Sequence, residues 1–116
     1  MNEIDGSILN DVLTMITGSL DEHEAFKKDA IIFINSAFST LNQIGVGPEE
    51  GFRITDDTAT WSEYCADPVL LDMVKEYIYL KTRISLDPPS NSFLMSNINE
   101  QIKELIFRMN VQSERG

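Results

Sequence analysis

One stretch of the chain carries oxygen-bearing side chains at alternating positions, an arrangement that loosely matches a calcium-binding loop. The side chains concerned are Asp56, Thr58, Thr60, Ser62 and Asp67. A calcium loop of this type needs glycine at its sixth position and a bidentate glutamate at its end. Because Trp61 occupies the sixth position and the closing glutamate is missing, we predict no metal site here.

The side chains best suited to nucleophilic chemistry are Cys65 and His23, the chain's one cysteine and one histidine. Cys65 has no CxxC partner and no basic neighbour that would lower its pKa. Glu22, His23 and Glu24 are adjacent on a predicted helix, so they cannot converge on one metal ion. We expect a surface histidine and a structural cysteine near Trp61. A catalytic Cys65–His23 pair stays open as an alternative, without any motif to orient it.

Other catalytic signatures are missing from the sequence. Gly45 and Gly47 precede Pro48, whereas a phosphate-binding loop leads into a helix with lysine and serine or threonine. We find no nucleophile elbow, no paired-carboxylate signature and no zinc spacing. We therefore predict that the protein is not an enzyme and has no catalytic residue, no cofactor and no bound metal.

Hydrophobic periodicity predicts a mainly α fold, a single four-helix domain over residues 1–116. The expected helices are Ser7 to Thr17, Glu22 to Ile44, Pro68 to Leu86 and Phe93 to Asn110. Caps support their bounds: Ser7, two capping boxes (Ser19-x-x-Glu22 and Asp21-x-x-Glu24), Gly18, Gly45 and Asp67-Pro68. The last two helices form a hairpin across the turn Asp87-Pro88-Pro89.

Two segments depart from this regular pattern. Residues 45–67, called the excursion below, contain three glycines and Pro48, so we expect a small β-hairpin or an extended connection. Trp61 and Tyr64 favour anchoring of the excursion over disorder. Residues 111–116 are expected to form a frayed, flexible tail.

In the last helix we expect a core stripe of Leu94, Ile98, Ile102, Leu105, Ile106 and Met109. In the helix before it, Tyr77 and Tyr79 cannot face the same core. We expect Tyr77 to be buried and Tyr79 to be an exposed contact.

The composition limits the class of protein. The chain is 42% hydrophobic, which fits a globular domain. We expect no secretory signal at the N-terminus and no membrane span, and the lone cysteine fits a reducing compartment. The net charge of −10 is concentrated in residues 1–74, which hold 14 acids and three bases. An acidic surface repels phosphate, so ordinary nucleic-acid binding is disfavoured.

The hairpin and its surroundings resemble the head–tail connector (adaptor, head-completion) proteins of tailed bacteriophages and prophages. The residues that carry the likeness are 74–83, Ile84-Ser85-Leu86-Asp87-Pro88-Pro89, Ser92-Phe93, 101–105, 107–110, and upstream 8–12, 41–47 and Trp61. The Asp-Pro-Pro turn between two helices is the most specific part. None of the likeness is a catalytic signature.

The resemblance implies a structural virion protein at the head–tail interface, made in the bacterial host cytoplasm. It implies a ring of about twelve identical subunits beneath the portal protein, which extends the DNA channel and docks a head-closure or tail protein. DNA would pass through the channel without specific binding, and no membrane is involved.

For contact with a neighbouring subunit or the next ring we select the Gly47–Tyr64 part of the excursion, and for contact with the portal the tail from Val111 to Gly116. The candidate residues are Phe52, Arg53, Trp61, Tyr64, Tyr79, Val111 and Arg115. Two alternative functions are an acidic DNA-mimic inhibitor and a helical protein-binding module. A mimic needs carboxylates spaced along one face like phosphates, whereas these acids cluster in the first helix and in loops.

Overall fold

The structure is a computed structural model that describes residues 6–18 and 23–115, with residues 23–25 as backbone alone. Five helices follow one another in this part of the chain: α1 (Ile8–Thr17), α2 (His23–Gln43), α3 (Trp61–Tyr64), α4 (Pro68–Leu86) and α5 (Ser92–Arg115). The described residues contain no strand, only an isolated antiparallel bridge between Ser7 and Thr60. The mainly α prediction is confirmed.

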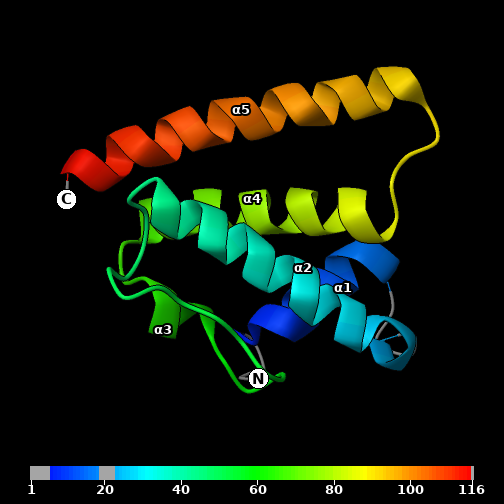
Figure 1. The fold of residues 1–116 in the computed structure, drawn as a ribbon, viewed down its shortest axis with the longest axis horizontal. Coiled ribbons are helices and arrows are strands. Elements are labelled where there is room, and N and C mark those ends of the chain that lie inside the picture. The colour runs from blue at the N-terminus through cyan, green and yellow to red at the C-terminus, as the bar shows by residue number, and fades with distance from the viewer. Residues whose placement is uncertain (1–5, 19–22, 116) are drawn as a thin grey trace.

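Helix α4 is the centre of the arrangement. It packs against α1, α2 and α5, and α1 also packs against α2. In Figure 1, α5 runs along one side of α4, and α1 and α2 cover the other side. Buried apolar side chains from all five helices and from the excursion form one hydrophobic cluster.

Local capping sets most helix ends where the sequence predicts them. The Ser7 hydroxyl accepts a hydrogen bond from the Asn10 amide at 3.2 Å and caps α1, which ends at Gly18 with φ 74°. Asp67 caps α4 by accepting from the Val69 amide at 3.0 Å, with Pro68 at the first helical position. The bounds of α4 agree with the prediction.

The end of α2 confirms the expected glycine cap. The Gly45 amide donates to the Asn42 carbonyl at 3.1 Å, and the Val46 amide donates to the Leu41 carbonyl at 2.9 Å. This pair of bonds is a Schellman motif, and Gly45 takes the positive φ of 87° that it requires. The two capping boxes proposed for the start of α2 fall outside the described residues or on side chains that are not described.

After the double proline, Asn91 caps α5 by accepting from the Phe93 and Leu94 amides at 2.8 and 3.0 Å. Helix α5 continues to Arg115, so the prediction that it ends at Asn110 is wrong. The core stripe of α5 is otherwise as predicted, but Leu94 is 41% exposed and does not belong to it. Tyr77 is buried, as predicted, and Tyr79 is half-buried.

The excursion takes the extended alternative, and the β-hairpin is not formed. Its last predicted strand instead begins a short helix, because Thr60 and Glu63 form a capping box in which the Glu63 carboxylate accepts from the Thr60 amide at 2.9 Å. Local capping therefore overrides the strand-like composition of residues 58–61. Trp61 then points into the core rather than along a strand.

Candidate interaction site

The two segments that the sequence selects for contacts lie at the same end of the molecule. In Figure 1 the connection that follows α2 and the red C-terminal end of α5 meet at one side. Side chains of the last turns of α5 bond to the excursion or its borders: Asn110 to the Ile44 carbonyl at 3.2 Å, Gln112 to the Asp67 carboxylate at 3.1 Å and Ser113 to the Gly45 carbonyl at 3.0 Å. The expected tail is thus a helix end fastened to the excursion.

A groove of about 530 Å³ lies where these segments meet. It is lined by Gly47, Pro48, Tyr64, Cys65, Asp67, Leu70, Gln112 and Ser113. The Tyr64 hydroxyl donates to the Val46 carbonyl at 3.3 Å, and burial raises the pKa of this phenol. The hydrogen bond from Gln112 lowers the pKa of Asp67, so this carboxyl is an acceptor at neutral pH.

Side chains of α1 and α2 hold the rest of the excursion in place. The Asn35 amide group both donates to the Ile54 carbonyl at 2.9 Å and accepts from the Ile54 amide at 2.7 Å. The Asn42 side chain donates to the Pro48 and Glu49 carbonyls at 3.1 and 3.3 Å. The Ser7 hydroxyl donates to the Asp57 carbonyl at 2.8 Å. An extended segment without sheet partners therefore has its polar backbone paired with side chains.

Two of the predicted contact residues are core residues, which corrects their assignment to a surface. Trp61 is 3% exposed and Tyr64 is 5% exposed. The Trp61 indole donates to the Asp11 carboxylate at 2.9 Å, and the Lys75 ammonium lies 5.7 Å from its ring centre. Tyr64 packs its ring against Phe38 and Phe52 at centroid distances of 4.8 and 5.2 Å. Both aromatic residues anchor the excursion.

The other predicted contact residues remain accessible to different degrees. Arg53, Val111 and Arg115 are exposed, whereas Phe52 and Tyr79 are half-buried. Arg53 lies on the excursion, and Val111 and Arg115 lie on the last turns of α5. The accessible candidates therefore lie on the excursion and on the last turns of α5, apart from Tyr79 in the middle of α4.

The oxygen-bearing side chains that loosely match a calcium loop form local turns and caps. Asp56 accepts from the Thr58 amide at 2.9 Å and from its hydroxyl at 2.6 Å, and these bonds lower the pKa of Asp56. Asp67 caps α4. Within the described residues no group of three or more His, Cys, Asp or Glu side chains is placed to hold a metal ion. The side chain of His23 is not described.

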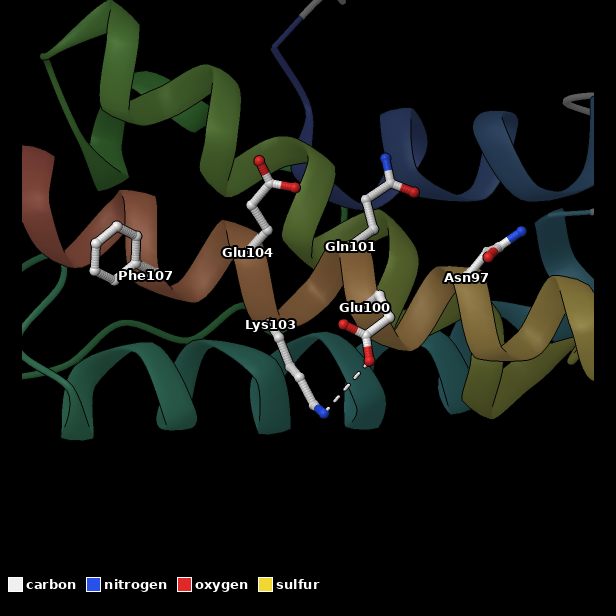
Figure 2. A pocket seen from close by; sticks show the side chains of 6 residues that line it. All are labelled: Asn97, Glu100, Gln101, Lys103, Glu104 and Phe107. Carbon is white, nitrogen blue, oxygen red and sulfur yellow. Dashed lines mark ion pairs between the residues drawn. The ribbon is translucent and has the colours of Figure 1, made fainter.

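Sequence reasoning missed the outer face of α5. Phe93 and Phe107 are 75% and 69% exposed, although both are large and apolar. Figure 2 shows an open hollow along this helix that runs from Asn97 to Phe107. Between them Lys103 and Glu100 form an exposed ion pair at 3.6 Å, which adds little stability. One sequence feature indicates this exposed face: Phe107 lies half a helical turn away from the core stripe.

The chain was compared with known proteins. A family model described as "Phage connector protein" matches residues 8–116. Comparisons with curated proteins and with solved structures gave no match. Among the described helices, none is both long enough and apolar enough to cross a bilayer.

Proposed function

This chain belongs to the phage connector protein family, and on that premise we propose that its copies form a ring beneath the portal protein. The ring connects the DNA-filled head to the tail or head-closure protein and extends the DNA channel. The match over residues 8–116 carries the proposal, because it includes every described helix. In this role the protein is a structural part of the virion, assembled in the host cytoplasm.

The arrangement of the helices supports ring formation. A closed ring of identical subunits needs two different, complementary surfaces on each subunit. Because α2 and α5 pack on different sides of α4, each leaves its outer face to a different side of the subunit. A subunit of this kind has the two surfaces that a head-to-tail contact uses.

The end formed by the excursion and the last turns of α5 supports a docking role. Seven hydrogen bonds described above join the excursion and its borders to α2 and α5, so the backbone there is held in one shape before any partner binds. A preformed surface loses less conformational entropy on binding than a disordered tail. We propose that Arg53 of the excursion and Val111 and Arg115 of α5 contact a neighbouring subunit, the next ring or the portal protein.

The charge supports passage of DNA without specific binding. A net charge of −10 gives the ring a surplus of carboxylates, and an acidic channel wall does not hold phosphate groups. In this proposal the chain catalyses no reaction and needs no cofactor. A ring map with a basic lining and with the acids outside would contradict the channel proposal.

The test is assembly of the full chain, alone and with the portal protein of the same phage, measured by mass photometry and negative-stain imaging. We expect rings of about twelve subunits, either alone or bound to the portal. A chain that stays monomeric in both samples would overturn the proposal. Inhibition of a DNA-binding enzyme by that monomer would favour the DNA-mimic alternative.

A further inference from the structure

The C-terminal half of α5 presents an apolar and basic strip to solvent. Phe107, Arg108, Val111 and Arg115 are all exposed and occupy neighbouring positions on the helix, since residues three and four apart lie side by side. Neither arginine forms an ion pair with any described residue. We call these four residues the α5 strip. It exposes a phenylalanine and two cations, with the exposed carboxylates of Glu104 and Glu114 beside it on the same helix.

A second surface with complementary properties lies between α2 and the excursion. A groove of about 330 Å³ runs here, lined on one side by α2, including Ser39, and on the other by residues 50–53. Phe52 is the large apolar residue of its lining. Ile32 of α2 is 62% exposed and lies two turns from Ser39 on the same helix face. We call this the α2 groove. The groove is concave and partly apolar, and no other segment of the described part of the subunit lines it.

The charge around the α2 groove is opposite to that of the α5 strip. Residues 49–57 carry four carboxylates against one arginine, a net charge of −3. Glu50 lines the groove together with Arg53, Glu49 immediately precedes Glu50, and all three side chains are exposed. Because each subunit carries −10 overall, two copies repel at long range, and a stable contact between them needs a local match of opposite charges. The α5 strip and the α2 groove supply that match.

No residue of α5 lines the α2 groove, so the α5 strip of the same subunit does not fill it. We propose that the α5 strip of one copy docks into the α2 groove of the next, with Phe107 in the groove and the arginines facing Glu49 and Glu50. This inference rests on the proposed ring and names the contact that closes it. Such a contact is heterologous, and repeating it leads to a ring rather than to a two-fold dimer.

Disulfide trapping tests the contact directly. The variant Phe107→Cys/Ser39→Cys is made in a Cys65→Ser background, and the assembled protein is oxidised and run on a denaturing gel. A disulfide forms only where Cα atoms come within about 7 Å, so we expect a ladder of covalent multimers from the double variant and none from either single variant. The matched control is Ser85→Cys/Ser39→Cys, which places the first thiol on an exposed position of α4.

Charge reversal tests whether opposite charges stabilise the contact between subunits. We expect Arg108→Glu/Arg115→Glu to lower the ring yield by about tenfold or more, and Glu49→Lys/Glu50→Lys to do the same. Combining all four changes in one chain restores opposite charges across the contact and is expected to restore rings. All four positions are exposed, so circular dichroism and thermal melting should match the starting protein.

The outcomes separate this inference from the proposed function. Covalent dimers from Phe107→Cys alone would show two α5 helices paired about a two-fold axis and would overturn the inference. Normal rings that neither form the ladder nor respond to charge reversal would overturn it while leaving the ring function intact. Absence of any ring from the unsubstituted chain, with and without portal protein, would overturn both.

Discussion

The α4–α5 hairpin and the excursion are stabilised in different ways. The hairpin is made by local signals: an aspartate and proline start α4, a double proline separates the helices, and Asn91 starts α5. The excursion has almost no regular structure and is held by side chains 6 to 68 residues away in sequence, such as Asn42 on Pro48 and Ser113 on Gly45. A segment without a repeating hydrogen-bond pattern can thus be as well ordered as a helix when distant side chains pair its backbone.

The hairpin should respond most strongly to loss of core packing. Leu105 of α5 is 2% exposed in the central cluster. We expect Leu105→Ala to lower the free energy of unfolding by about 2–5 kcal/mol, because it removes buried methyl groups and leaves a cavity. Urea denaturation measures the change.

Phe107→Ala is the matched control on the same helix. Its side chain is exposed, so we expect a change within about 0.5 kcal/mol. A loss smaller than this for Leu105→Ala would mean that the described core face of α5 is wrong.

The excursion should respond to backbone and contact changes at its first turn. Gly47 has φ 90°, and a Cβ atom there would meet the ring of Tyr64. We expect Gly47→Ala to cost about 1–2 kcal/mol for the left-handed backbone and about 1–3 kcal/mol more for the collision, measured by thermal and urea unfolding.

Gly45→Ala separates these two effects. Gly45 has a similar φ of 87°, but a Cβ atom added there would meet no other atom within 4 Å. The additional loss of stability in Gly47→Ala, relative to Gly45→Ala, therefore measures the cost of the collision with Tyr64. Equal losses at both glycines would contradict the close approach of Tyr64 to this turn.

A smaller effect is expected from one hydrogen-bonding side chain. Asn35→Ala leaves the amide and carbonyl of the buried Ile54 without their partner, at a cost of about 1–3 kcal/mol. Gln43→Ala removes an exposed amide from the same helix and should change stability by less than about 0.5 kcal/mol. Hydrogen exchange at Ile54 should accelerate in the first variant alone, and unchanged exchange there would contradict the role of Asn35.

The limits of sequence reasoning follow from the same contrast. The bounds of α4 are predictable to the residue because Asp67, Pro68 and Asp87 act on their immediate neighbours. The pairing of Asn35 with Ile54, or of Ser113 with Gly45, depends on how the helices pack, and nothing local to either residue indicates it. For the same reason the sequence does not indicate that residues 111–115 are helical. Their polar side chains bond to the excursion instead of extending a core stripe.

The candidate site is predictable in outline. Composition selects the excursion, the family resemblance selects the C-terminal segment, and the structure joins the end of α5 to the start of the excursion. Trp61 and Tyr64 lie in the core rather than on the surface, because an aromatic ring in an irregular segment is as suited to anchoring as to binding. Exposure depends on tertiary packing, so sequence alone does not separate the two roles.

The native thiol of Cys65 is a chemical probe of the groove between the excursion and the end of α5. This thiol is half-buried in the groove between the excursion and the end of α5, with its sulfur 3.7 Å from the Asp67 carbonyl. Its alkylation rate in the unlabelled protein therefore reports how accessible this groove is. A partner that covers the groove would slow the reaction, so a simple mass-spectrometric time course follows docking without any added label.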